Sequence, residues 1–194
     1  GIALYPMHSQ DHGELLKCAD IAMYRSKKEG KNRAILFNIS MMAPIHERMK
    51  IGEHLHSALA RMEFELYMQP QILVETGKIV SLEALLRWNS PVLGRVPPDK
   101  FIPVAEETHL IVQIGDWVLR EACRFLKKMH KEGYTRLSVS VNVSMVQLLQ
   151  QDFPSSVAKI LSEYGIDSSF IELEITESVL MGSGEAIAKG LQAL

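Results

Sequence analysis

Several short segments of the chain alternate apolar and polar residues, and this period-two pattern predicts β-strands. The alternation is clearest in residues 78–88, where one face holds Val80, Leu82, Ala84, Leu86 and Trp88 and the other holds Ser81, Glu83, Leu85 and Arg87. Residues 137–144 and 170–178 repeat it, and residues 64–70 are a further strand candidate. Each of the three alternating strands therefore has one apolar face and one face that carries polar side chains.

Apolar residues at helical spacing lie between and after these strands. They predict helices over about residues 99–107, 110–132, 144–165 and 183–194. Strands that alternate with helices of this length indicate parallel βαβ units and an α/β fold.

The first 62 residues are organised differently. They predict a short strand at the N-terminus, a helix over residues 13–30 that stops at Gly30, and a second strand at residues 33–37. Ser40 is a candidate N-cap for a connecting helix over residues 43–62. We therefore expect three segments: residues 1–38, a connecting helix within residues 39–62, and an α/β domain over residues 63–194.

The polar faces need an explanation, because parallel strands of an open, helix-covered sheet are apolar on both faces. A closed (β/α)₈ barrel of the TIM type provides one, since one strand face meets the helices and the other points into a lumen whose C-terminal rim is the usual active site. Glu83, Asn142 and Glu174 would all project inward near that rim. The alternative is a half-solvated antiparallel sheet in which Glu83 and Arg87 form a surface ion pair of little energetic value. The intervening helices favour the barrel.

The polar side chains suggest metal chemistry. Carboxylate and amide oxygens suit Mg²⁺, Mn²⁺ or Ca²⁺ better than zinc, and a cation would offset the cost of placing Glu83 and Glu174 close together. Arg87 follows Glu83 by four residues on the same face, where a guanidinium can hold a phosphate through two hydrogen bonds. These features together point to metal-assisted phosphoester chemistry.

Composition and charge narrow the set of partners. The net charge of −2 gives no reason to expect a nucleic-acid polymer or an acidic membrane as partner, whereas a compact anionic ligand needs only a local pocket. The sequence contains no run of about 18 apolar residues, so it predicts no membrane span. The two cysteines, Cys18 and Cys123, lie too far apart for a metal or redox motif. We expect the segment to lie in the cytoplasm, without membrane contact of its own.

Residues 83–88, EALLRW, resemble the signature of the EAL family of cyclic-di-GMP phosphodiesterases, which fold as modified (β/α)₈ barrels. From about residue 52 to the end, further blocks resemble this family in its own order: FELYMQP, the long block that begins GRVPPDKF, VSVNVSMVQL and IELEITESVLM. Residues 1–38, through GIALYP and LLKCADIAMYRSKKEGKN, are similar to the end of a GGDEF diguanylate cyclase domain. GGDEF followed by EAL is a common tandem, so the resemblance implies part of such a protein.

The resemblance implies a role for each matching residue. Glu83, Asn142 and Glu174 match the family's metal ligands, which hold two Mg²⁺ or Mn²⁺ ions. Gln69, Leu85 and Arg87 match positions that contact or shape the ligand, with Arg87 on a phosphate. Glu177 matches a glutamate that steadies a loop over the site. The family's reaction opens one phosphodiester of cyclic-di-GMP and gives linear pGpG.

The sequence also departs from the family pattern. The family's aspartate pair, lysine, glutamate and glutamine on later strands are absent up to Leu194, so we expect an incomplete barrel that does not turn over substrate alone, with a second copy of the chain as a candidate partner. Met68 stands where an aromatic residue is common, and His109 stands where glycine is common. The rival interpretation is a non-catalytic module that binds cyclic-di-GMP as a receptor or mediates protein contacts.

Overall fold

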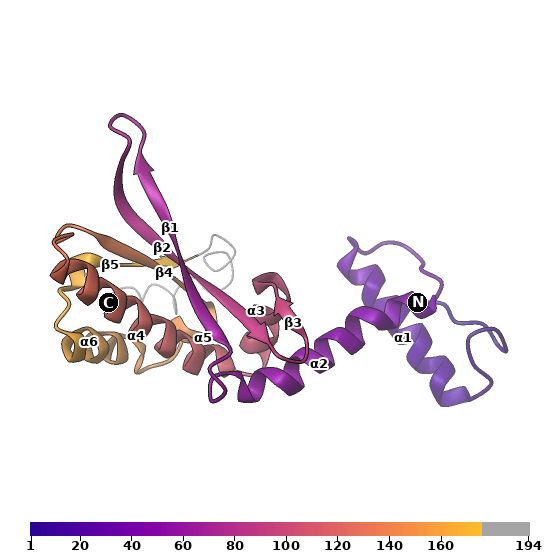
Figure 1. Ribbon diagram of the computed structural model, residues 1–194. Coiled ribbons are helices and arrows are strands. Elements are labelled where there is room, and N and C mark those ends of the chain that lie inside the picture. The colour runs from indigo at the N-terminus through magenta and orange to yellow at the C-terminus, as the bar shows by residue number, and fades with distance from the viewer. Residues whose placement is uncertain (176–194) are drawn as a thin grey trace. The chain divides into compact units, whose positions relative to one another are not determined.

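The computed structural model describes residues 1–175, and its contacts divide the chain into two compact units, Gly1–Glu53 and His54–Leu194 (Figure 1). Within the described residues, no helix combines the length and the apolar character that crossing a membrane requires.

The first unit is built around helix α1, His12–Lys28. Asp11 caps this helix, since its side chain accepts a hydrogen bond from the backbone N–H of Glu14 at 2.8 Å. Cys18, Ala22 and Phe37 form the buried core. The strands predicted at the N-terminus and at residues 33–37 are wrong as regular strands. Ile2 and Leu36 form only an isolated parallel bridge, because the chain turns away directly after Leu4.

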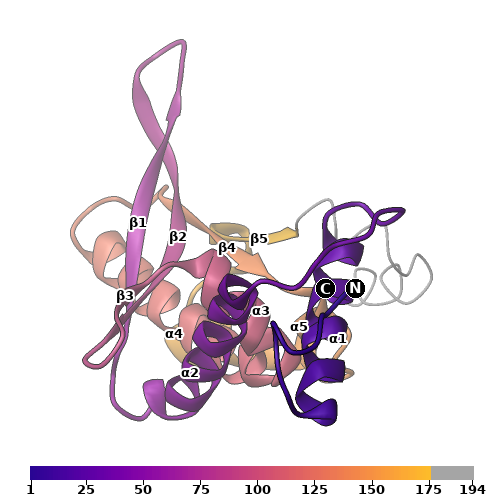
Figure 2. The same cartoon turned by 90° about the vertical axis from the view of Figure 1, so that its right-hand side faces the viewer.

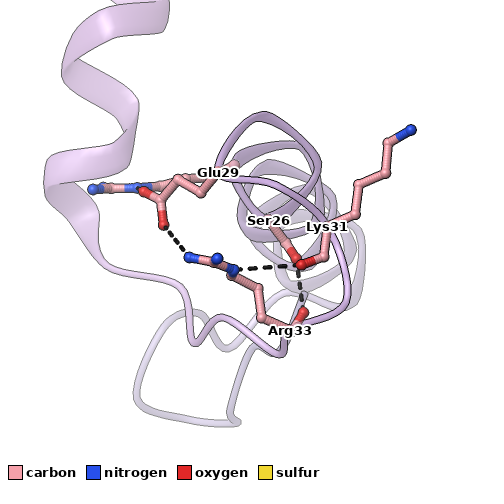
Figure 3. Close-up of polar contacts among 5 residues, drawn as sticks. Ser26, Glu29, Lys31 and Arg33 are labelled. Atoms are coloured by element: carbon pink, nitrogen blue, oxygen red, sulfur yellow. Dashed lines mark hydrogen bonds and ion pairs between the residues drawn. The ribbon is translucent and has the colours of Figure 1, made fainter.

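The end of α1 is tied to the loop that follows it (Figure 3). The Ser26 hydroxyl donates to the backbone oxygen of Arg33 at 2.7 Å, and the Glu29 carboxylate lies 3.7 Å from the guanidinium of Arg33. Gly30 has a φ of +102°, which a residue with a side chain rarely adopts. The predicted helix stop at Gly30 is thus confirmed.

The connecting segment contains two helical pieces. Asn38 caps the 3₁₀-helix η1, Ile39–Met42, and α2 follows at Ala43–Ala58. The prediction that Ser40 caps the connecting helix is wrong, because Ser40 lies inside η1 and its own N–H is bound by the Asn38 side chain at 2.9 Å.

The second unit contains a mixed sheet in the order β1-β2-β4-β5, with β3 paired to β2 (Figure 1). The strands are β1 (Phe64–Leu73), β2 (Lys78–Ser90), β3 (Gly94–Val96), β4 (Ser138–Val143) and β5 (Ile171–Ile175). Strands β2, β4 and β5 are parallel as predicted. Strands β1 and β2 are antiparallel instead, because the connection between Leu73 and Lys78 is too short for a parallel crossover. Strand β3 was not predicted.

Helices fill the connections between the parallel strands (Figures 1 and 2). They are α3 (Pro98–Glu107), α4 (Leu110–Lys131), α5 (Met145–Leu148), α6 (Phe153–Tyr164) and the 3₁₀-helix η2 (Ser168–Phe170). The single helix predicted over residues 144–165 is two helices. The break precedes Pro154, which suits the first turn of a helix but cannot continue one. The helix predicted over residues 183–194 lies outside the described residues.

The apolar strand faces pack against the helices, as the alternation predicted. Trp88 of β2 is fully buried, and its ring lies 5.6 Å from Phe101 of α3 and 6.1 Å from Phe64 of β1, measured between centroids. Helix α4 packs against β1, β2, β4 and α6. The α/β class is therefore confirmed for the described part of the chain, and closure of the sheet into a barrel stays a prediction.

Candidate functional site

Three of the predicted site residues lie on neighbouring parallel strands of the sheet. Glu83 is on β2, Asn142 is on β4, and Glu174 is on β5. The amide nitrogen of Asn142 donates a hydrogen bond to Glu83 Oε1 at 2.8 Å. Asn142 is also the direct partner of Glu174 in the β4–β5 pairing. Because directly paired residues point to the same face of a sheet, one amide stands between two carboxylates.

The remaining predicted ligand-contacting residues extend this face across β1 and β2. Gln69 is paired directly with Glu83. Leu85 and Arg87 follow Glu83 at two-residue intervals, which keeps them on the same face. The structure thus brings Gln69, Leu85 and Arg87 onto the face that carries Glu83. Glu177, the predicted loop-steadying residue, lies outside the described residues.

The Arg87 side chain is held locally. Its Nη1 donates to the backbone oxygen of Leu86 at 2.9 Å, and its guanidinium lies 5.5 Å from the centroid of the Tyr67 ring. A guanidinium at this distance is attracted by the ring quadrupole. Arg87 is half-buried, so its charge is partly shielded from water while remaining accessible.

A cavity of about 340 Å³ adjoins these residues at the end of β2 and β4. Its walls are mainly apolar, and Arg87, Glu106, Asn142 and Gln147 supply polar groups to it. Apolar walls with a few polar groups are typical of small-molecule sites. Partial burial, with a smaller contribution from neighbouring Glu107, raises the pKa of Glu106 above its usual value.

A second, larger cavity does not coincide with these residues. A cavity of about 670 Å³ lies between α6 and β5, where Leu161, Ile171 and Leu173 contribute to its wall. None of the predicted site residues lines that cavity. We assign the candidate site to the smaller cavity, because Arg87 and Asn142 both reach it.

Gln147 closes one side of the smaller cavity. It forms a capping box with Ser144 at the start of α5, and it is buried. Helix α4 comes close at this point: a Cβ atom added to Gly115 would lie 1.9 Å from the Gln147 amide nitrogen. Only glycine fits at position 115 while Gln147 keeps this place.

Ser140 lies one step below Asn142 on the same face of β4. It is paired with Glu83 on one side and with Glu172 on the other, and it is completely buried. Its hydroxyl has no hydrogen-bond partner among the described residues. The position below Asn142 is therefore shielded from solvent, whereas Glu172, below Glu174, is exposed.

The oxygen donors of Glu83, Asn142 and Glu174 fit a hard divalent cation. Two carboxylates and one amide on adjacent strands are the oxygen ligands that Mg²⁺ and Mn²⁺ accept in proteins. Within residues 1–175, no group of three or more His, Cys, Asp or Glu side chains gathers at one point. The site is thus defined by two glutamates with an asparagine between them.

Tyr67, Arg95 and Glu106 are polar neighbours of the site that the sequence analysis did not identify. Tyr67 could have been found from the alternation of β1, since it precedes Gln69 by two residues. Arg95 belongs to β3, a strand too short for its alternation to be recognised. Glu106 is in a predicted helix, and only the tertiary packing of α3 places it at the cavity.

Comparison with known proteins decides the family. The EAL domain family matches residues 53–194. The chain belongs to this family. Its EAL domain therefore covers β1–β5 and the helices between them.

Curated relatives extend the likeness beyond the EAL domain. The bifunctional diguanylate cyclase/cyclic di-GMP phosphodiesterase MucR of Pseudomonas aeruginosa is 40% identical over 186 residues, which are 96% of this chain and 27% of MucR. The cyclic di-GMP phosphodiesterase NbdA of the same organism is 38% identical over 181 residues, 93% of this chain and 23% of NbdA. The chain thus spans about a quarter of the length of these relatives.

Solved EAL structures share the fold. The PaMucR phosphodiesterase in its c-di-GMP complex matches with a TM-score of 0.70 and 37% identity, over 74% of this chain and 58% of that one. The EAL domain of Mycobacterium smegmatis DcpA matches with a TM-score of 0.53 and 33% identity, over 68% of this chain and 50% of that one.

Proposed function

We propose that the EAL domain of this protein hydrolyses cyclic-di-GMP to linear pGpG in a reaction that depends on Mg²⁺ or Mn²⁺. The observation that carries the proposal is the row formed by Glu83, Asn142 and Glu174 on adjacent strands, with Arg87 on the same face. The names of MucR and NbdA as cyclic di-GMP phosphodiesterases support the choice of substrate.

The charge of each side chain determines its proposed role in binding the cations or the substrate. Glu83 and Glu174 carry the negative charge that a divalent cation requires, and Asn142 adds a neutral oxygen donor between them. When bound, the cations would activate a water molecule and stabilise the leaving oxygen of the phosphodiester. Arg87 would bind a phosphate oxygen of the substrate, Gln69 would contact the ligand beside Glu83, and Leu85 would shape the pocket wall between them. Glu177 would steady a loop over the site.

The expected chemistry is hydrolysis at one of the two phosphodiesters. Water adds to phosphorus, the bond from phosphorus to one ribose oxygen breaks, and that oxygen takes up a proton. The ring opens and a terminal phosphate remains on the linear product.

We also propose that residues 1–38 are the end of a GGDEF domain, followed by the connecting helix and the EAL domain. The match to MucR includes 96% of the chain and therefore extends well upstream of residue 53. The name of MucR as a diguanylate cyclase and phosphodiesterase supports this arrangement. Such a tandem would belong to cyclic-di-GMP signalling in the cytoplasm.

The test is a hydrolysis assay on the full-length protein. Cyclic-di-GMP is incubated with Mg²⁺, with Mn²⁺ and with EDTA, and pGpG is separated and quantified. Changing residues that merely orient metal ligands costs about 10–100-fold in activity or metal affinity, so Glu83→Ala, which removes a ligand, should cost at least about 100-fold. Glu75→Gln, in the exposed turn between β1 and β2, is the charge-matched control and should leave the rate unchanged.

Each outcome decides between two functions. Metal-dependent pGpG formation that disappears in Glu83→Ala supports the phosphodiesterase. A folded wild-type protein that binds cyclic-di-GMP but forms no pGpG with either metal would contradict it. The non-catalytic receptor would then be the better account.

A further inference from the structure

Two arginines share one tyrosine ring next to the site. The guanidinium carbons of Arg87 and Arg95 each lie 5.5 Å from the centroid of Tyr67, a distance within the range of cation–π attraction. The ring is about half exposed, so solvent and a ligand can reach it although both guanidinium groups lie nearby. The three residues come from three strands, β1, β2 and β3.

The pairing of the strands places all three side chains on the face that carries Glu83. Tyr67 is paired directly with Leu85, and Arg95 is paired directly with Asn89. Leu85 and Asn89 alternate with Arg87 along β2 and share its face. Trp88 pairs with β1 on one edge and with β3 on the other, so Arg95 reaches Tyr67 across β2.

Within the described part of the chain, neither guanidinium has a carboxylate partner. In residues 1–175, no carboxylate oxygen lies within 4.0 Å of Arg87 or Arg95, although Glu65 is paired directly with Arg87 along the strands. Other arginines of the same unit do form such pairs, as Arg120 does with Glu163 and Arg124 with Glu121. Two unneutralised cations next to one ring repel each other, and an anion placed between them removes that repulsion.

We propose that Arg95 is a second anion-contacting residue of this site, and that Tyr67 is the positioning residue that holds both arginines toward the ligand. The inference rests on the proposed function and adds to it. A ligand with two phosphates, such as cyclic-di-GMP, would place one phosphate at Arg87 and the rest of its negative charge within reach of Arg95. The site is thereby divided into a carboxylate side, for cations, and a guanidinium side, for phosphate.

The decisive experiment measures binding without hydrolysis. The affinity of the full-length protein for cyclic-di-GMP is determined by calorimetry in EDTA at low salt. Arg95→Gln should raise the Kd about tenfold, which corresponds to the loss of one charge-assisted contact. Lys78→Gln, at the far end of β2, removes the same charge from an exposed position and should change the Kd less than twofold.

Tyr67 is tested by two substitutions with opposite expected results. Tyr67→Phe keeps the ring and should bind like the wild type, because the hydroxyl of Tyr67 has no hydrogen-bond partner among the described residues. Tyr67→Leu removes the ring and should raise the Kd severalfold. If Tyr67 had only a structural role, the Kd of Tyr67→Phe and the Kd of Tyr67→Leu would depend on salt concentration in the same way. The wild type and Tyr67→Phe should lose affinity more steeply with added NaCl than Arg95→Gln does.

Failure of this inference differs from failure of the proposed function. If wild-type protein binds and hydrolyses cyclic-di-GMP while Arg95→Gln binds as tightly as Lys78→Gln, Arg95 is not a ligand contact and the phosphodiesterase still stands. If wild-type protein neither binds nor hydrolyses cyclic-di-GMP, the proposed function is wrong, and the proposal that rests on it is wrong as well.

Discussion

At the scale of single residues, the neutral side chain of Asn142 is the informative one. It stands between Glu83 and Glu174, donates to the first and is paired along the strands with the second. A third carboxylate at this position would add like-charge repulsion to a site that already holds two. An amide supplies an oxygen donor without that charge. An amide at position 142 therefore suits the proposed cation site better than a third carboxylate would.

Glu106 gives a prediction that pH can test. Burial raises the pKa of its carboxyl, with Glu107 adding to the effect, so the folded protein holds the proton more tightly than the unfolded chain does. The resulting stabilisation is complete below the unfolded pKa and is lost as pH rises through the folded pKa. Glu106→Gln removes this dependence. The free energy of unfolding of Glu106→Gln should therefore increase relative to that of the wild type as pH rises from about 4 to 7.

Urea unfolding at several pH values in that range measures the difference. Glu75→Gln, in the exposed β1–β2 turn, controls for the loss of a carboxylate elsewhere. A difference between Glu106→Gln and wild type that stays constant with pH, or that moves in favour of the wild type at higher pH, would contradict a raised pKa at Glu106.

At the scale of elements, strand alternation predicted which side chains share the polar face of the sheet, but it did not predict every strand direction or helix boundary. Val139 and Val141 alternate with Ser140 and Asn142, and this was enough to place Asn142 on the polar face of β4. The antiparallel direction of β1 depends on a turn of a few residues, which alternation does not report. The two-helix form of residues 144–165 depends on Pro154 and on tertiary packing, since the apolar spacing runs across the break.

The junction between α3 and α4 holds a residue other than glycine in a left-handed backbone conformation. His109 has a φ of +59° and caps α4 without a side-chain hydrogen bond. This left-handed conformation favours glycine over a residue with a side chain. His109→Gly should therefore raise the free energy of unfolding by about 0.5–1 kcal/mol.

Thermal unfolding of His109→Gly and of His109→Ala provides the comparison. Alanine removes the imidazole but keeps the steric cost of a positive φ, so only the glycine variant should be stabilised. Equal melting temperatures for the two variants would show that the backbone conformation at residue 109 carries no cost.

At the scale of the whole molecule, two carboxylates and two guanidinium groups lie on one face of the sheet in the EAL domain. Glu83 of β2 and Glu174 of β5 are the carboxylates, and Arg87 of β2 and Arg95 of β3 carry the guanidinium groups. Gln69 is paired with Glu83, and Leu85 lies between Glu83 and Arg87 along β2. A metal-dependent reaction on a phosphodiester needs both kinds of charge within the length of one small molecule. The EAL family match covers the strands that carry these residues, and their roles in the reaction are part of the proposal.

Binding of Mn²⁺ tests the central claim, that side chains from three adjacent strands form one cation site. Electron paramagnetic resonance of free Mn²⁺ gives the affinity of the full-length protein directly and does not require turnover. Wild-type protein should bind Mn²⁺, Glu83→Gln and Asn142→Ala should each weaken binding at least about tenfold, and Glu75→Gln should not change it. Equal Mn²⁺ affinity in all four proteins would place the cation elsewhere and contradict the account.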